Sequence, residues 1–423
     1  MRELLIQSFR AAVDAADART VLAAHLPRPP SRGRTLVVGA GKAAGSMAQA
    51  VERHWPKDAS LQGLALTRYG HALPAGRIRI VEAGHPLPDA AGEAGTREML
   101  AQIQALGHGD LLLALVSGGG SSLLSLPAEG VLTEELRVLT SALLRCGATI
   151  QEINTVRKHL SATLGGRLAA ACKAPIVALI VSDVTGDDPT HIASGPCAPD
   201  PSTYRDALEV LVRYGVQAPG SIAEHLARGA QGKIDETPKP GDPVFARVEN
   251  HVIATAHRSL EAAAGWFGAR GIRPVILGDT VTGEASEVAK VMAALVREAR
   301  GFGGALAPPL ALISGGECSV TVRNASGRGG RCAEFLLALA VELDGLPRVH
   351  AIAADTDGID GSEDNAGALI APDSLARAAA LGLVPRKCLA ANDSYAFFDA
   401  LDDLVVTGPT YTNVNDYRAI VVS

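Results

Sequence analysis

Residues 35–45 read TLVVGAGKAAG, an apolar run that passes through a glycine-rich turn into a segment with helical spacing. Short apolar runs that end in glycine or polar residues, each followed by a helix-like segment, recur through both halves of the chain. This alternation predicts strand–helix units around a mostly parallel sheet. In such sheets ligands bind where the strands end, because loops and helix N-termini there present backbone N–H groups. The residues just after each strand are therefore the candidates for a functional site.

The chain of 423 residues is long enough to form two lobes, each with its own core and with a cleft between them. A turn-rich stretch, ETPKPGD at residues 236–242, predicts the boundary, so we expect domains at residues 1–240 and 241–423. Strands are expected in the first half at 35–38, 63–67, 78–82, 111–116 and 176–181, with helices near 43–54, 92–106 and 134–144. In the second half we expect strands at 252–254, 274–277, 310–313, 319–323, 349–353, 404–406 and 419–422, and helices near 258–271, 284–300, 331–343 and 374–382.

Composition excludes several classes of function. The net charge of −6 and the lack of a long Lys/Arg block argue against nucleic acid as a partner. Six well-separated cysteines without a C-x-x-C pair argue against a disulfide scaffold or a zinc site, and favour a reducing compartment, the cytoplasm. Neither a signal peptide nor an apolar stretch of about 18 residues is found, so no membrane association is expected. Aromatic residues are only 4% of the chain, which favours a small polar substrate.

The first strand-end loop contains Gly39, Gly41 and Lys42, whose backbone N–H groups could approach an anion closely. It loosely matches a dinucleotide fingerprint, but the second strand ends at Thr67-Arg68 without the acid that binds the ribose. NAD is therefore disfavoured, although Arg68 leaves NADP open. Lys42 is not a Walker-type lysine, because Ala43 stands where Ser or Thr is required. It either faces a phosphate, which we favour, or is an exposed lysine on the first turn of a helix.

A second loop, SGGGSS at residues 117–122, offers Ser117, Gly118, Gly119, Gly120 and Ser121 as a cradle for phosphate or carboxylate. The alternative is a flexible loop without function.

A third loop, SDVTGDD at residues 182–188, holds three carboxylates that repel one another unless cations or donors share them. They are either solvated or directed at Mg²⁺, with Asp187 as a metal ligand and Asp183 near the substrate. Arg157 and Lys158 lie on different faces of an expected helix, so only one of these cations can face a cleft; a solvated face is the alternative.

The second half carries Glu317 after a strand, and then GRGGR at residues 327–331. Glycines beside the two guanidinium groups of Arg328 and Arg331 suit a phosphate clamp. Arg331 opens a helix, whose dipole attracts anions, whereas Arg328 between two glycines is as often a mobile surface residue. Asp355 begins the string DTDGIDG at residues 355–361, which departs from a calcium-binding EF-hand loop and is interpreted as a strand-end acidic loop near a nucleotide or metal.

Taken in this order, the motifs resemble the class II glycerate kinases, the glycerate 2-kinase family whose C-terminal part is called the MOFRL domain. The strings that carry the resemblance cover nearly the whole chain: GAGKA at 39–43, GHPLPD at 84–89, SGGGSS at 117–122, VRKHLS at 156–161, SDVTGD at 182–187, SGP at 194–196, RGGR at 328–331, DTDGIDG at 355–361 and TGPTYTNVND at 407–416. One departure is Cys332-Ala333 before Glu334, where the family pattern has Asn-Gln. It bears on contacts around Arg331, which is itself kept.

The resemblance implies two α/β lobes, the first Rossmann-like and the second containing the MOFRL region at about residues 306–416, with glycerate and ATP with Mg²⁺ bound in the cleft between them. It implies phosphorylation of D-glycerate to 2-phosphoglycerate with release of ADP, and Lys42 and Arg331 match the proposed catalytic pair of the family. In this hypothesis the glycine loops and Mg²⁺ hold ATP, Arg157 or Lys158 binds the substrate carboxylate, and Asp183 orients or deprotonates the hydroxyl.

Two alternatives stay open at the level of the sequence. One is an NAD(P)H-dependent hydroxypyruvate reductase, a label that this family has often carried, and the other is a non-catalytic sugar-acid sensor. The residues alone do not distinguish the 2- from the 3-phosphate product. They also leave open the metal ligands, the pathway and the tolerance for related hydroxy acids. The oligomeric state is not determined either, and a homodimer is compatible with the sequence.

Overall fold

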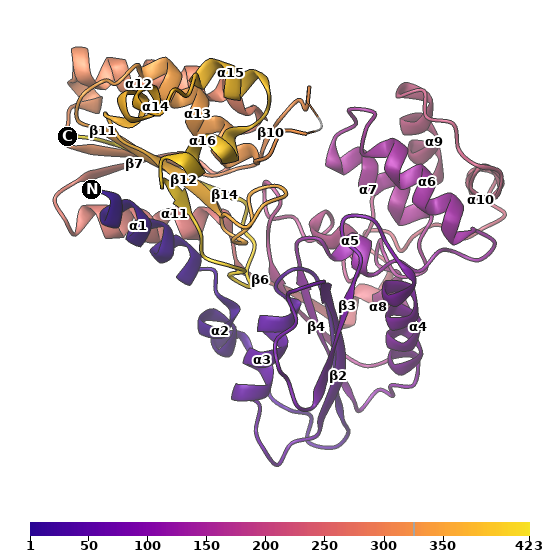
Figure 1. Cartoon of the computed structure of the whole chain (residues 1–423). Coiled ribbons are helices and arrows are strands. Elements are labelled where there is room, and N and C mark those ends of the chain that lie inside the picture. Colours follow the sequence, from indigo (N-terminus) through magenta and orange to yellow (C-terminus); the bar gives the residue numbers. More distant parts are fainter. Residues whose placement is uncertain (325) are drawn as a thin grey trace. The chain divides into compact units, whose positions relative to one another are not determined.

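The computed structural model describes residues 1–324 and 326–423, which form two compact units (Figure 1). Unit I comprises Ala18–Ile253, and unit II combines Met1–Asp17 with Ala254–Ser423. The contacts therefore divide the chain after residue 253 and not at the expected position 240, because the strand β6 (Val248–Ala254) still belongs to the sheet of unit I.

Unit I is built on a six-stranded sheet in the order β3-β2-β1-β4-β5-β6. The other strands are β1 (Thr35–Ala40), β2 (Leu61–Arg68), β3 (Ile78–Ala83), β4 (Leu111–Ser117) and β5 (Ile176–Val181). All pairings among β1 to β5 are parallel, which confirms the expected parallel sheet. The strands β1, β4 and β5 are buried along their whole length, as continuous apolar runs predict. The strand order reverses between β1 and β4, so the loops after these two strands lie at the switch point of the sheet.

The helices of unit I include a cluster with a core of its own, formed by α6, α7, α9 and α10 around residues such as Leu139, Val156 and Tyr204. The α-helices are α2 (Ala18–Val21), α3 (Ala44–His54), α4 (Ala90–Gln104), α5 (Gly120–Leu123), α6 (Thr133–Leu143), α7 (Ile150–His159), α8 (Arg167–Ala170), α9 (Tyr204–Arg213) and α10 (Gly220–Ala230), with short 3₁₀ turns η1 (Leu22–His25), η2 (Ile192–Ser194) and η3 (Pro243–Arg247).

Helices α9 and α10, which precede the turn-rich stretch at residues 236–242, were not expected from the sequence. Glycine in α10 serves packing, since a β-carbon on Gly229 would lie 2.3 Å from the ring of Tyr204. Gly229 thus permits the close approach of α10 to α9.

Unit II has a second six-stranded sheet, in the order β13-β12-β11-β14-β9-β7. The strands are β7 (Arg273–Gly278), β9 (Leu310–Ser314), β11 (Val349–Asp355), β12 (Gly367–Ile370), β13 (Leu404–Val405) and β14 (Asp416–Val422). Only β7 and β9 pair in parallel, and the other four pairings are antiparallel. The expectation of a mostly parallel sheet in this half was wrong. A helix-free connection as short as that from β11 to β12 cannot return the chain to a parallel start.

A small parallel pair joins β8 (Gly283–Glu284) to β10 (Cys318–Ser319), so the strand expected at residues 319–323 is limited to its first residue. The helices of unit II are α1 (Arg2–Asp14), α11 (Ala256–Gly268), α12 (Ala285–Gly301), α13 (Arg331–Leu343), α14 (Ser374–Ala380), α15 (Pro385–Ala390) and α16 (Ser394–Ala400), with a 3₁₀ turn η4 (Gly304–Leu306).

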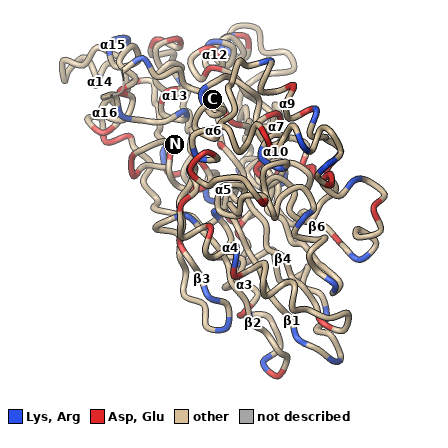
Figure 2. Tube along the Cα trace, turned by 90° about the vertical axis from the view of Figure 1, so that its right-hand side faces the viewer, with Lys and Arg blue, Asp and Glu red and all other residues tan. Residues whose placement is uncertain are grey.

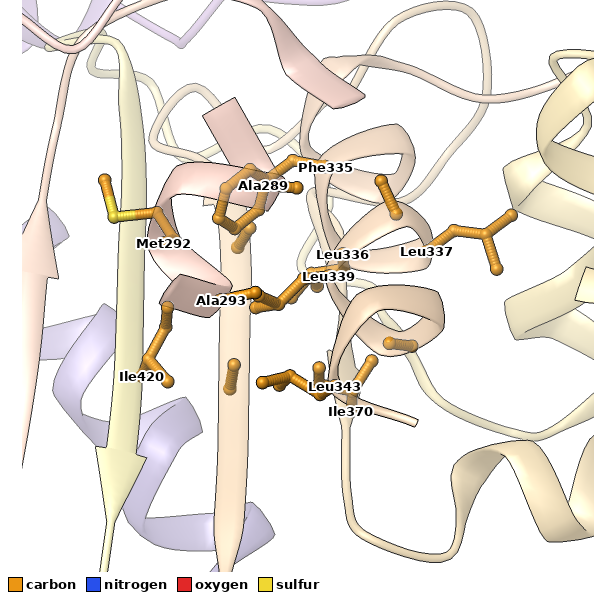
Figure 3. Packing of buried hydrophobic residues seen from close by; sticks show 14 of the residues in the cluster. Ala289, Met292, Ala293, Phe335, Leu336, Leu337, Leu339, Leu343, Ile370 and Ile420 are labelled. Carbon is orange, nitrogen blue, oxygen red and sulfur yellow. The ribbon is translucent and has the colours of Figure 1, made fainter. Parts of the chain in front are cut away.

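Helices cover both faces of this sheet. Alternate residues of β9 point to opposite sides, with Leu310 and Leu312 in the core beneath α12 and α13, and Ala311 and Ile313 in the core beneath α1 and α11. Figure 3 shows the first of these cores, where side chains of α12 and α13 meet those of the sheet, including Ile420.

The N-terminal helix α1 is part of unit II, although the expected division assigned it to the first domain. Phe9 is buried against Tyr417 of β14, with ring centroids 5.9 Å apart. The hydroxyl of Tyr417 also lies 2.9 Å from that of Ser8. The first and last elements of the chain therefore share one core.

Charged residues of both signs are interspersed along the described chain (Figure 2). All six cysteines are free thiols. Among the described residues, no helix combines the length and the apolar character that a membrane span requires.

Candidate active site

The loops after β1 and β4 interlock at the switch point of unit I. The amide of Lys42 donates to the carbonyl of Gly118 (2.8 Å), and that of Ala43 donates to the hydroxyl of Ser117 (3.0 Å). The amide of Gly41 donates to Leu66 of the neighbouring strand (3.1 Å). The N–H groups of the β1 loop are therefore used within the protein and are not directed at a ligand.

Three of the expected binding residues have structural tasks here. A β-carbon on Gly41 would lie 2.1 Å from the Ser117 hydroxyl, and one on Gly39 would lie 2.9 Å from the β-carbon of Ala65. Ser117 itself is fully buried. Gly39, Gly41 and Ser117 hold the two loops and the strands together, and their expected contact with a ligand stays a prediction.

Backbone amides that could bind a ligand belong to Gly119, Gly120 and Ser121, in the loop after β4. Within the described residues, no hydrogen bond from the amides of these three residues to the protein is found. Gly119 has a left-handed conformation (φ 80°), and a β-carbon there would lie 2.8 Å from Nε2 of His85 and 3.5 Å from Cγ of Lys42. The stem of Lys42 and the ring of His85 thus lie beside the cradle formed by these three residues.

Ser194 completes this part of the site, because its hydroxyl lies 2.7 Å from that of Ser121. It belongs to Ala193-Ser194-Gly195, three consecutive residues with positive φ between 49° and 59°. Two non-glycine residues in this region of backbone space store strain, which proteins concentrate at functional positions. Ser194 and His85 stand in motifs quoted above, but their contribution to the site was not expected from the sequence.

The acidic loop after β5 begins with Ser182, whose hydroxyl accepts from the amide of Val184 (3.3 Å). Asp183 and Asp187 are both partly buried, and Asp187 has a left-handed backbone with φ of 55°. Asp188 is committed to the turn, because its carboxylate accepts from the amide of Thr190 (2.9 Å).

The two neighbouring cations of α7 have different surroundings. Lys158 is 2% exposed and forms an ion pair with the buried carboxylate of Asp200, with Nζ and Oδ1 3.3 Å apart. Arg157 lies on another face of the helix and lines a small pocket together with Ser121. We therefore drop Lys158 from the expected binding residues and keep Arg157.

Unit II presents Arg331 at the first position of α13, surrounded by carboxylates. Its Nε lies 2.7 Å from Asp416, its Nη2 lies 2.6 Å from Asp355, and its Nη1 lies 3.3 Å from Glu317. Burial lowers the pKa of the Arg331 guanidinium, but the nearby carboxylates outweigh this and raise it well above its usual value. Asp416 and Asp355 fix the plane of the guanidinium, whereas the partner of Nη1, Glu317, is exposed.

The expected phosphate clamp at the start of α13 is already filled by the protein. The carboxylate of Asp360 accepts from the amides of Cys332 (3.0 Å) and Ala333 (2.8 Å), where a phosphate would bind. Arg328 lies 4.9 Å from the ring centroid of Tyr395 in a cation–π contact. Both guanidinium groups of the expected clamp, the exposed Arg328 and the partly buried Arg331, are still present beside the capped helix end.

Burial raises the pKa of two carboxyl groups in and beside α13. Burial raises the pKa of Asp360 to about 6, against the lowering effect of the Cys332 and Ala333 amides. Burial, together with repulsion from Glu284, raises the pKa of Glu334 to about 7. Glu334 also lines a pocket with Arg331 and Asn392.

Family models cover most of the chain. A domain of unknown function, DUF4147, matches residues 4–227, and the MOFRL family matches residues 310–416. A D-glycerate 2-kinase of Thermotoga maritima is 39% identical over 418 residues, which are 98% of this chain and 97% of the relative. The crystal structure of glycerate kinase from that organism superimposes with a TM-score of 0.88 at 38% identity, covering 100% of this chain and 99% of the other. The chain belongs to the glycerate 2-kinase family.

Members of the glycerate 2-kinase family also carry another name. A protein of Agrobacterium vitis that is 51% identical over 423 residues, 100% of this chain and 94% of the relative, has the provisional name hydroxypyruvate reductase.

The metal requirement of a glycerate 2-kinase can be compared with the side chains present. In residues 1–324 and 326–423, no three His, Cys, Asp or Glu side chains are grouped so that they could hold a metal ion. Mg²⁺ in phosphoryl-transfer sites usually keeps several waters and takes one or two carboxylates plus phosphate oxygens from the substrate. The donors of the loop after β5 fit this sparse mode, in which the ion arrives with the nucleotide.

Proposed function

We propose that this chain is an ATP-dependent kinase that transfers the γ-phosphoryl group of ATP to the 2-hydroxyl of D-glycerate, in the cytoplasm. The observation that carries the proposal is the arrangement of the two glycine loops, in a chain of the glycerate 2-kinase family. The open amides belong to Gly119, Gly120 and Ser121, and Lys42 lies beside them. A cluster of N–H donors next to an ammonium group suits a phosphoryl group, whose charge is spread over several oxygens.

In the proposed mechanism the protein contributes mainly alignment and positive charge. Lys42 neutralises the transferring phosphoryl group beside the cradle. Arg331, held in plane by Asp355 and Asp416, is the second proposed catalytic cation, and its Nη1 faces the exposed Glu317. Asp183 orients the substrate hydroxyl and accepts its proton as the oxygen attacks phosphorus.

Mg²⁺ would be held by Asp187 together with the phosphates, and it would supply charge neutralisation of the β- and γ-oxygens.

The reductase name carried by some relatives is less well supported by the geometry. Dinucleotide sites direct the amides of the loop after the first strand at the pyrophosphate. Here those amides bond to Leu66, Gly118 and Ser117. The second strand also ends at Arg68, without the acid that binds the ribose of NAD.

The test is ADP release by the purified protein with Mg·ATP and D-glycerate, with the product coupled through enolase in the absence of phosphoglycerate mutase. Signal through enolase is expected, because only the 2-phosphate is an enolase substrate. ADP without that signal would indicate the 3-position. No ADP above the glycerate-free control, together with NADPH oxidation in the presence of hydroxypyruvate, would overturn the proposal in favour of the reductase.

A further inference from the structure

We propose that the cavity beside Ser121, with Arg157 at its wall, is the subsite that binds the carboxylate of the substrate and rejects neutral polyols such as glycerol. This inference rests on the proposed function and assigns one end of the substrate to a defined part of unit I.

The first argument is the charge of Arg157. Burial lowers the pKa of its guanidinium to about 10, and no carboxylate offsets this effect. Among the described residues, no ion pair or hydrogen bond of the Arg157 side chain is found. Arg157 is half-buried, and a cation partly withdrawn from water is unfavourable unless a counter-charge accompanies it, so the fold leaves a place for an anion.

The second argument is the chemistry of the cavity wall. It carries no Asp or Glu, and its polar groups are Arg157 and hydroxyls, including those of Ser125 and Thr140. Both residues are more than nine-tenths buried, and neither hydroxyl makes a hydrogen bond with the described part of the chain. Hydroxyl donors beside a guanidinium match the oxygens of a carboxylate.

The third argument is rigidity. Helix α7 begins with a capping box between Thr149 and Glu152, and Glu152 also binds Arg213 of α9 with 2.6 Å between the charged atoms. At its other end, Lys158 is paired with Asp200, which also accepts from Thr237 (3.0 Å). These bonds fix the rotation of α7, so that Arg157 is held against the cavity.

The fourth argument is position, because Ser121 belongs both to the cavity wall and to the cradle. A three-carbon acid that places its carboxylate at Arg157 therefore directs its hydroxyls toward Gly119 and Lys42, where phosphoryl transfer is proposed. Glycerol would leave the guanidinium without a counter-charge and should bind poorly.

The test compares Arg157→Met with Arg137→Met, a control on α6 whose guanidinium is half exposed and pairs with Glu134. D-glycerate binding is measured by titration calorimetry without nucleotide, and KM and kcat are measured for D-glycerate and glycerol. Arg157→Met should weaken glycerate binding and raise KM roughly 10- to 100-fold, as loss of a hydrogen-bonded charge does, and should reduce the preference for glycerate over glycerol by a similar factor. Arg157→Lys should fall between wild type and Arg157→Met, and the control should match wild type.

Thermal unfolding separates this role from a structural one. Arg157→Met should keep or raise the melting temperature, because the lost charge has no internal partner, whereas Lys158→Met should lower it by leaving Asp200 unpaired. Unchanged glycerate affinity in Arg157→Met, or a lowered melting temperature with unchanged affinity, would overturn the subsite. If wild type releases no ADP, the proposed function fails, and calorimetry with tartronate on wild type and Arg157→Met still decides whether the cavity binds carboxylates.

Discussion

Single residues decide how the site of unit I is assembled. Gly41 permits Ser117 to approach the loop after β1, and Gly119 leaves room for His85 and Lys42 beside the cradle. The adjacent residues Arg157 and Lys158 carry the same charge, yet one lines a cavity and the other pairs with Asp200. Residue type alone therefore does not tell a binding cation from a structural one.

Lys42→Met tests the proposed catalytic cation. We expect kcat to fall by about 100- to 1,000-fold, similar to the loss of an oxyanion donor, with a smaller effect on KM for glycerate. The measurement is steady-state kinetics of wild type and Lys42→Met. Lys57→Met, a substitution at an exposed position, is the control. A kcat within a few-fold of wild type would remove Lys42 from the mechanism. Arg331→Ala is less informative, since it also removes a guanidinium partner from Asp355 and from Asp416, which keeps its ion pair with Arg418.

Glu334 makes stability depend on pH. Its folded pKa of about 7 is above the ordinary value of 4.5, so the folded protein binds the proton more tightly than the unfolded chain does. The stability that this provides is complete below about pH 4.5 and is lost as pH rises through 7. Glu334→Gln cannot ionise, so its free energy of unfolding relative to wild type should rise between pH 4.5 and 8, by on the order of 3 kcal/mol.

Urea unfolding of wild type and Glu334→Gln at several pH values is the measurement, with Glu298→Gln at an exposed position of α12 as the control. Parallel stability curves for wild type and Glu334→Gln would mean that Glu334 is ionised in the fold.

At the scale of elements, the N-terminus of α13 depends on a residue from a distant loop. Asp360 accepts from the buried amides of Cys332 and Ala333. Asp360→Ala should lower the free energy of unfolding by about 1–3 kcal/mol, because these amides lose their acceptor. Amide hydrogen exchange at residues 332 and 333 should accelerate. Ser362→Ala, in the same loop but exposed, should leave both quantities unchanged. Wild-type exchange rates in Asp360→Ala would show that another group caps the helix.

At the scale of the whole molecule, the first helix stabilises the unit formed by the end of the chain. Phe9→Ala removes a buried ring that packs on Tyr417 and should cost about 3–5 kcal/mol in unit II. Hydrogen exchange should accelerate in β14 while β1 keeps its protection, because α1 and β14 share a core. Phe302→Ala, at an exposed position, is the control. Equal loss of protection in β1 and β14 would mean that the two units unfold together.

Local pattern predicted much of this protein without tertiary information. The apolar runs located β1, β4 and β5, and the parallel sheet of unit I followed from their alternation with helices. The glycine-rich strings after these strands pointed to the switch point, and the order of the motifs identified the family. These features can be predicted from the sequence because strand burial and glycine turns depend on residues that are neighbours in the chain.

Tertiary structure alone decided the rest. The antiparallel sheet of unit II, the membership of α1 in that unit and the packing of Gly229 on Tyr204 depend on contacts between distant segments. The roles of the site residues depend on such contacts as well. Asp360 accepts from the amides at the start of α13, and the β1 loop bonds to Ser117 and Gly118. Arg157 lines a pocket, whereas Lys158 pairs with Asp200. The sequence determined which groups could bind an anion. Whether each of these groups already bonds to another residue of the same chain depends on burial and pairing in the folded structure, which no local sequence pattern encodes.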